Sequence, residues 1–200
     1  MEQTIIFPRL IIITTFFCQY SFALDDEFFD FETFTASFSQ SIVSENDDSG
    51  SKATGEIFIS KPNSILWHVK LPTERILLIR DSSISIYDPD LNQVLKSDID
   101  IFEEAKWIRV FTDRDARNRL ERIIERSNSS TRIIYRSLFK DSRLREFVIN
   151  KESDKIRSIA IYLSGKDRFE ITMERVEINS NISEDYFYSL IPADAEVIVQ

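Results

Sequence analysis

The sequence predicts an α+β protein made mainly of antiparallel strands. We expect a curled, open half-barrel of about 11 strands, with an N-terminal helix and a helical lid that encloses an apolar cavity. Short strand-forming runs recur between turn residues, at a spacing close to the roughly 8–12 residues of antiparallel architectures. Many runs alternate apolar and charged residues, which gives the sheet one apolar face. A sheet with so many strands must curl, because strands twist.

The first two dozen residues differ from the rest of the chain. Arg9 precedes the apolar run from Leu10 to Phe17, and Ser21 and Ala23 are the small residues that signal peptidase requires. The run is too short to span a membrane. We therefore expect a secretory signal peptide over residues 1–23, cleaved after Ala23, and export of a single domain over residues 24–200.

The single cysteine, Cys18, lies in the segment that we expect to be removed. Phe16 and Phe17 precede it, whereas lipoprotein signal peptidase requires small residues just before the cysteine. Cys18 is therefore interpreted as part of the signal peptide and not as a lipid anchor. The mature chain then has no thiol and must be stabilised by core packing.

The first elements of the mature chain are a short helix and a strand. Phe28 and Phe31 stand at helical spacing among acidic residues, which predicts a helix from about Asp25 to Glu32. The period then changes to two. One face of the predicted strand carries Phe34, Ala36, Phe38, Gln40 and Ile42, and the other face carries Thr and Ser residues.

The next two strands form the hairpin from Gly55 to Pro72, whose turn is Lys61-Pro-Asn-Ser. Its second strand alternates, so that Ile65, Trp67 and Val69 share one face. This surface is either ordinary core or the wall of a site for an apolar ligand; for Trp67 both interpretations stay open. The predicted lipid-binding wall consists of Phe34, Phe38, Ile57, Ile59, Ile65, Trp67 and Val69.

After three more short strands, the segment from Asp98 to Phe111 breaks the pattern. Its apolar residues fit an amphipathic helix, which we expect to close over the open barrel as a lid. The predicted lid residues are Ile101, Phe102, Ala105, Ile108 and Phe111. The segment from Asp113 onward is either a second helix or a helical turn that enters a strand, with Asp113 as the N-cap. Its arginine run, Arg114 to Arg126, is interpreted as a solvated face. Strands resume after it.

Several functional classes are excluded by composition and motifs. The net charge of −9 argues against a nucleic-acid partner and against binding to anionic headgroups. His68 is the single histidine and faces away from Trp67, so we expect no metal site, no cofactor and no histidine-based catalysis. Tyr87-Asp88-Pro89 is interpreted as a strand end followed by a turn. The chain has no nucleophile elbow, P-loop or dinucleotide fingerprint, and we expect no enzyme.

Three motifs, in order, resemble the LolA family of periplasmic lipoprotein carriers. They are "FTASFSQ" (residues 34–40), "GEIFISKPNSILWHV" and "SISIYDPDLNQV". A looser similarity covers "FYSLIPADAEVIV". The resemblance implies an open β-barrel with a helical lid that shields lipoprotein acyl chains. It also implies cargo taken from a LolCDE-type ABC transporter and given to a LolB-type acceptor, by a protein that we expect to be a monomer.

The sequence departs from the family pattern before the Pro-Asn turn. The family arginine that is thought to hold the lid closed is Lys61 here, a single donor centre in place of a planar fork. Lys61 is either a lid latch or an ordinary turn lysine that projects into solvent. Three functions fit the sequence: a lipoprotein carrier, a divergent lipid- or lipoprotein-binding sensor or acceptor, and an interaction domain with a filled core.

Overall fold

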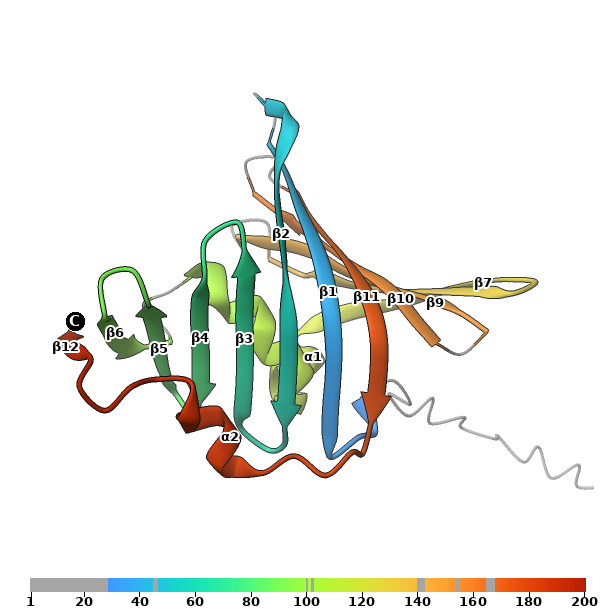
Figure 1. Cartoon of the computed structure of the whole chain (residues 1–200). Helices are drawn as coiled ribbons and strands as arrows, with labels where there is room; N and C mark the ends of the chain where they lie inside the picture. Colours follow the sequence, from blue (N-terminus) through green and yellow to red (C-terminus); the bar gives the residue numbers. More distant parts are fainter. Residues whose placement is uncertain are drawn as a thin grey trace, which may run out of the picture.

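The computed structural model describes residues 29–44, 47–99, 101, 103–139, 143–153, 155–164 and 168–200. One 12-stranded sheet runs through them in the order β12-β6-β5-β4-β3-β2-β1-β11-β10-β9-β8-β7 (Figure 1). The expected signal peptide over residues 1–23, with Cys18, lies outside the described residues, as does the first half of the helix expected before β1. The residues from Asp30 to Glu32 are described and are not helical.

The strands follow the chain as a series of antiparallel neighbours, and only the β12–β6 pair among the described strands is parallel. Their bounds are β1 (Thr33–Ser44), β2 (Asp47–Ser60), β3 (Ser64–Leu71), β4 (Arg75–Arg80), β5 (Ser83–Asp88), β6 (Gln93–Asp98), β7 (Leu120–Ser127), β8 (Ser130–Ser137), β9 (Leu144–Glu152), β10 (Lys155–Leu163), β11 (Arg168–Ile178) and β12 (Glu196–Val199).

The sheet has one strand more than the sequence predicted. The additional strand is β7, in the segment that the sequence left open between a second helix and a turn entering a strand. Both parts of the second alternative are present, because a short helix, α1 (Arg114–Asn118), leads into β7. Asp113 caps α1 as expected: its Oδ1 accepts hydrogen bonds from the backbone N–H of Asp115 at 2.8 Å and of Ala116 at 3.2 Å.

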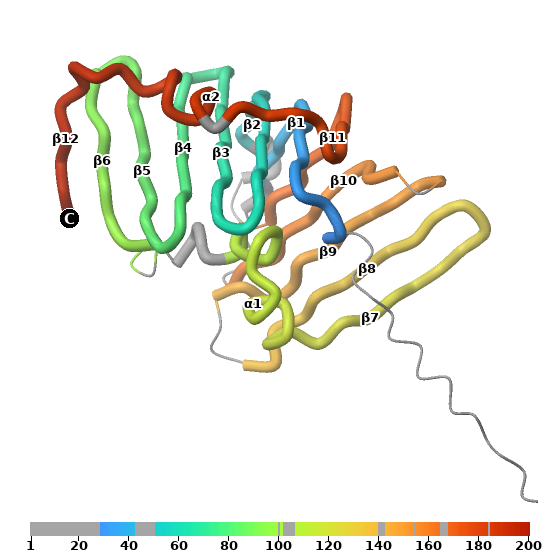
Figure 2. The backbone as a smooth tube through the Cα atoms, turned by 90° about the horizontal axis from the view of Figure 1, so that it is seen from below, coloured from blue at the N-terminus to red at the C-terminus, as the bar shows by residue number. Residues whose placement is uncertain are grey.

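The predicted alternation of β1 determines which face of the sheet is buried. Phe34, Ala36 and Phe38 are at most 4% exposed, and they belong to the large core cluster. Thr35 and Ser37 between them point to the other face and are half-buried. The sheet curls around this apolar face, and the helical segments η2 (Glu103–Phe111) and α1 lie inside the curve (Figure 2).

Gly55 is required where β2 approaches β3. A Cβ atom at this position would lie 2.0 Å from the backbone oxygen of His68 and 2.8 Å from the ring of Phe38. The register of the two strands shifts between Thr54 and Gly55. The Phe38 ring thereby comes close to the Trp67 indole, with 4.5 Å between their centroids.

The lid segment is helical as expected, but η2 is a 3₁₀-helix and not an α-helix. The expected apolar stripe is also incomplete, because Ile101 lies before the helix and is 63% exposed. Ile108 and Phe111 are buried, whereas Phe102 and the side chain of Ala105 lie outside the described residues. The last four predicted lid residues recur every three positions, and this is the period of a 3₁₀-helix.

The outer face of the sheet has a core of its own. The helix α2 (Glu184–Ser189) packs there, and its Phe187 is buried against Leu66, Ile76 and Tyr87. Figure 2 shows α1 and α2 on opposite sides of the sheet. The terminal run therefore forms a helix as well as the strand β12, which pairs with β6. None of the described helices is long and apolar enough to cross a membrane.

Candidate functional site

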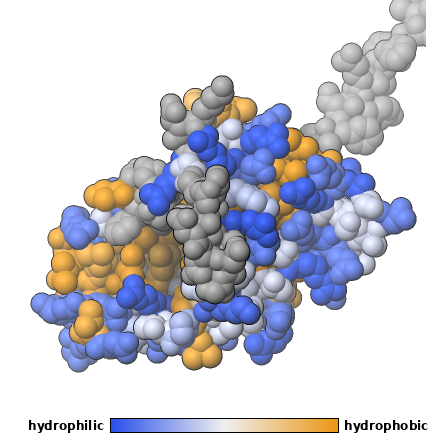
Figure 3. Space-filling model, turned by 90° about the horizontal axis from the view of Figure 1, so that it is seen from above, coloured by the Kyte–Doolittle hydropathy of each residue, from blue (hydrophilic) through white to orange (hydrophobic). Residues whose placement is uncertain are grey.

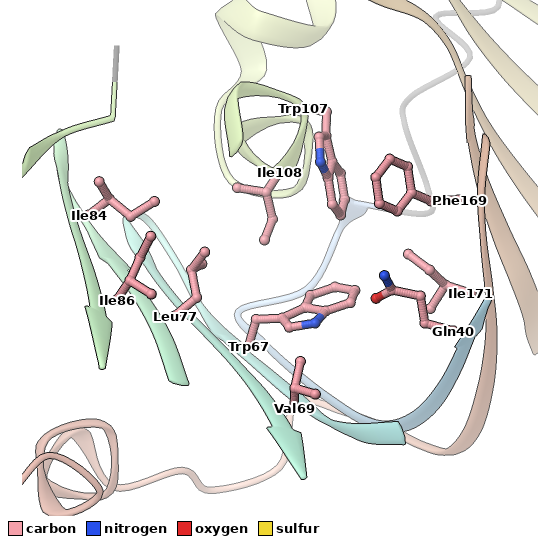
Figure 4. A pocket seen from close by; sticks show the side chains of 10 residues that line it. All are labelled: Gln40, Trp67, Val69, Leu77, Ile84, Ile86, Trp107, Ile108, Phe169 and Ile171. Carbon is pink, nitrogen blue, oxygen red and sulfur yellow. The ribbon is translucent and has the colours of Figure 1, made fainter. Parts of the chain in front are cut away.

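A cavity of about 290 Å³ lies on the inner face of the sheet, below η2 (Figure 4). The two walls come from distant parts of the sequence: β3 to β5 on one side, and β1 with β11 on the other. The lining residues are Gln40, Trp67, Val69, Leu77, Ile84, Ile86, Trp107, Ile108, Phe169 and Ile171. Apart from Gln40, all of these side chains are apolar or aromatic, which suits a hydrocarbon ligand better than a polar one.

Trp67 belongs to the core and to the cavity at once. Its indole lies 4.5 Å from the Phe38 ring centroid and 5.8 Å from that of Trp107, at nearly a right angle to the latter. The residue is 8% exposed and lines the cavity. Of the two interpretations that the sequence left open for Trp67, the structure shows a core residue that also lines a cavity, and contact with a ligand stays a prediction.

The predicted wall residues divide into two groups. Trp67 and Val69 line the cavity. The other five, on the same side of the sheet, are at most 3% exposed within the core cluster: Phe34, Phe38, Ile57, Ile59 and Ile65. They pack behind the cavity without lining it.

The roof of the cavity is the second half of η2. Trp107 and Ile108 point down into the space from this helix (Figure 4). Phe111, one turn later, is fully buried and meets the Phe147 ring edge-on at 5.5 Å. Sequence reasoning had not assigned Trp107 to the site, although its position beside Ile108 on an amphipathic segment was a usable signal.

The other lining residues missed from sequence are Gln40, Leu77, Ile84, Ile86, Phe169 and Ile171. Their strands were predicted, but the cavity depends on cross-strand register. Trp67 pairs with Leu77, and Leu77 pairs with Ile86, so that one row of the sheet forms a wall. The row continues through Leu95 to Ile198, which is 41% exposed at the sheet edge. Figure 3 shows apolar surface gathered at the left of the molecule, the side on which β6 and β12 lie in Figure 1.

Lys61 lies in the β2–β3 turn and contacts the segment that precedes β1. Its ammonium donates a hydrogen bond to the backbone oxygen of Phe29 and lies 4.5 Å from the ring centroid of Phe31. Burial, and then the positive charge of Arg117, lower the pKa of Lys61 below its usual value, against the opposite effect of Glu32. The described side-chain contacts of Lys61 are thus with residues 29–31 and not with the η2 backbone.

Arg117 corrects the expectation that the whole arginine run is solvated. It is 8% exposed, and its Nη1 donates to the backbone oxygen of Val110 in η2 at 2.7 Å. Its guanidinium also lies 4.3 Å from the centroid of the Phe29 ring. Because the Phe29 ring contacts Phe111 at 6.1 Å, Arg117 joins the roof helix to the segment that Lys61 also holds.

His68 lies on the face opposite to Trp67, as expected, and its Nε2 is 2.7 Å from Oε1 of Glu74. Asp88, at the end of β5, pairs with Arg75 at 3.1 Å. Among the described residues, no group of three His, Cys, Asp or Glu side chains is arranged to hold a metal ion.

The sequence profile of the family described as "Outer membrane lipoprotein carrier protein LolA" matches residues 30–189. This match covers most of the chain. The chain belongs to the LolA family. It is 25% identical over 171 residues to an outer-membrane lipoprotein carrier protein of Hahella chejuensis, covering 84% of this chain and 82% of the relative. It is 21% identical over 175 residues to the corresponding protein of Idiomarina loihiensis, covering 83% and 80%.

The fold has a solved counterpart in an uncharacterized conserved protein from Thermus thermophilus. The TM-score is 0.56 at 12% sequence identity, over 87% of this chain and 94% of the other, so this likeness concerns the fold alone. The first motif that resembles the family, "FTASFSQ", lies in β1, and its alternate residues form the inner face of this strand. Phe34, Ala36 and Phe38 enter the core, and Gln40 reaches the cavity.

Proposed function

We propose that this protein carries lipoproteins through the periplasm with their acyl chains in the cavity. In this proposal it receives them from a LolCDE-type ABC transporter and delivers them to a LolB-type acceptor. The observation that carries the proposal is the cavity itself, whose lining is apolar except for Gln40. Membership of a carrier family supports the same conclusion.

The physical basis is the transfer of hydrocarbon out of water. Each buried methylene contributes about 0.8 kcal/mol, so a chain that buries about ten of them gains roughly 8 kcal/mol. Several chains bound this tightly would not leave again. A carrier must therefore oppose part of this gain.

The roof supplies the opposing contribution. In the closed protein, Trp107 contacts the rings of Trp67 and Phe147, with centroid distances of 5.8 and 6.2 Å. The cavity of about 290 Å³ stands at the lower end of the roughly 300–1,000 Å³ typical of small-molecule sites. A cargo with several chains must displace η2 and lose these contacts, so that its net affinity is a difference and release becomes possible.

The predicted site residues fit into this scheme in two roles. We propose that the seven wall residues named from sequence become accessible as η2 moves, Trp67 and Val69 first. We also propose that Lys61 acts as an indirect latch, which holds η2 through a residue between them. It holds the backbone of Phe29, whose ring in turn contacts Phe111 of η2.

Intrinsic fluorescence tests the binding directly, because both tryptophans of the chain, Trp67 and Trp107, line the cavity. We expect a diacylated lipopeptide to shift their emission in a saturable way and to displace an apolar fluorescent probe. Ile86→Glu should weaken binding, because it places a charge in the wall. Ser85→Glu, one residue earlier on the other face of β5, is the matched control.

Two results separate the alternatives. No saturable binding, with tryptophan emission insensitive to the lipopeptide, would indicate a filled core and contradict the proposal. Binding without any delivery to an acceptor would favour a sensor if lipoproteins remain correctly located in cells depleted of the protein, and an acceptor if they do not.

Processing is a separate part of the proposal. We propose that residues 1–23 are a cleaved signal peptide and that the mature chain is a monomeric domain starting at Leu24. Mass spectrometry of the exported protein should give an unmodified N-terminus at Leu24. A diacylglyceryl group on Cys18 would contradict this and favour a membrane-anchored acceptor.

A further inference from the structure

Gln40 is the one amide in an otherwise apolar cavity. It stands on β1, where cross-strand pairing places it between Ala53 of β2 and Ile171 of β11. Three positions of the same strand face, Phe34, Ala36 and Phe38, are buried in the core before it. Gln40 therefore marks the place where the apolar face of β1 gives way to a polar group.

The amide of Gln40 makes no side-chain hydrogen bond with any residue in the described part of the chain, and in Figure 4 it points into the cavity beside Trp67 and Ile171. A glutamine amide has two N–H donors and one carbonyl acceptor. The side chain is half-buried, so its amide can be solvated while the cavity is empty. An occupant that displaces this water leaves the amide unpaired unless it supplies a partner of its own, so a ligand with a hydrogen-bonding group at this point is favoured.

We infer that Gln40 recognises the carbonyl oxygen of the ester or amide that joins an acyl chain to the rest of the lipid or lipoprotein. This inference rests on the proposed function, because it assumes that the cavity holds acyl chains. Leu77, Ile84 and Ile86 form the opposite wall, with Ile108 above them. A chain with its carbonyl at Gln40 runs from β1 and β11 toward this wall.

The consequence is a fixed depth of binding. The apolar walls contribute per methylene and do not distinguish one position along a chain from another. A hydrogen bond at one point does distinguish them, because a ligand displaced from it leaves the amide unpaired. Gln40 thus selects acyl groups over plain hydrocarbon and keeps the ester or amide linkage of the bound chain near β1.

The test compares two lipids that differ only in the acceptor: a diacylglycerol, and the dialkyl ether with chains of the same length. Tryptophan emission gives both affinities. We expect the unaltered protein to prefer the diacylglycerol by about three- to tenfold, the range of one neutral hydrogen bond. Gln40→Met, which keeps the length of the side chain, should abolish this preference while the ether still binds. Ser39→Met, a control at the preceding position on the exposed face of β1, should keep it.

The possible failures are distinguishable. If the unaltered protein binds neither lipid, the proposed function is overturned, and this inference with it. If both lipids bind equally, or if Gln40→Met weakens both by the same factor or keeps the ester preference, this inference alone is overturned. The circular dichroism spectrum of each free variant must match that of the unaltered protein, and Gln40→Glu, which lacks the amide donor, provides a second variant with the same expected loss of preference.

Discussion

The guanidinium of Arg117 should hold the roof helix in its closed position. It donates to the backbone oxygen of Val110 in η2 at 2.7 Å and covers the Phe29 ring at 4.3 Å. The substitution Arg117→Met removes both contacts and keeps most of the aliphatic stem. Arg114→Met is the matched control, because Arg114 is exposed on the same short helix.

The magnitude follows from these two contacts. A hydrogen bond to a charged group contributes about 1.5–3 kcal/mol, and its loss leaves the Val110 oxygen without this donor. A partly desolvated cation–π contact adds about 0.5–2 kcal/mol. Part of this loss is offset because the buried charge no longer needs to be desolvated. We therefore expect Arg117→Met to reduce the free energy of unfolding by about 2–4 kcal/mol.

Urea unfolding followed by tryptophan emission measures this loss, since Trp107 reports on the roof. With a typical slope of about 2 kcal/mol per molar urea, the midpoint should fall by about 1–2 M in Arg117→Met. It should change by no more than about 0.3 M in Arg114→Met, as expected for a surface position. Equal midpoints in the two variants would refute the reasoning, and Arg117 would then be an ordinary surface arginine in solution.

Three further predictions concern the frame around the cavity. Gly55→Ala should lower the free energy of unfolding by at least about 1–3 kcal/mol, because the new Cβ meets the backbone of His68; an unchanged urea midpoint would contradict the close approach. Burial raises the pKa of Tyr186, so the neutral phenol favours the folded state. The stability from this group is fully present below the ordinary pKa of about 10 and is lost as the pH rises through the raised value. In Tyr186→Phe the decrease in stability at alkaline pH, above about pH 9.5, should be smaller. A pH profile identical to that of the unaltered protein would contradict the raised pKa of Tyr186. Lys61→Leu removes the donor to the segment before β1 and should lower the melting temperature, whereas the exposed Lys52→Leu should not; equal melting temperatures would leave Lys61 without a role as a latch.

The secondary structure of most of the chain could be predicted because it depends on local pattern. Period-two alternation in β1 gave both the strand and its buried face, and Asp113 gave the N-cap of α1. Where the local pattern was ambiguous, the choice between helix and strand could not be made from the sequence. Leu120, Ile123 and Ile124 stand at helical spacing, yet the segment is β7.

Pairing with β8 decides the structure of β7. Eight register pairs join the two strands from Leu120–Ser137 to Ser127–Ser130, and Glu121 adds an ion pair to Arg136 at 3.8 Å. These partners lie in a different strand, so no property of the β7 segment alone could reveal them. The type of the lid helix is the converse case, because its three-residue period was already visible in the sequence.

The sequence by itself determined that this protein has a many-stranded sheet with an apolar inner face and an amphipathic helix to cover it. It did so because side-chain period and turn chemistry are properties of neighbouring residues. The second apolar core, on the outer face under α2, became visible only in the structure. Only the tertiary structure decided where the cavity is. Leu77 and Ile171 are far apart in the chain and face each other because the sheet curls, and Gln40 meets them through its register with β11. The burial of Arg117 also depends on a distant residue, because Phe29 covers its guanidinium from the segment before β1. Curl, register and burial are sums over many distant contacts, and a single sequence does not contain them in local form.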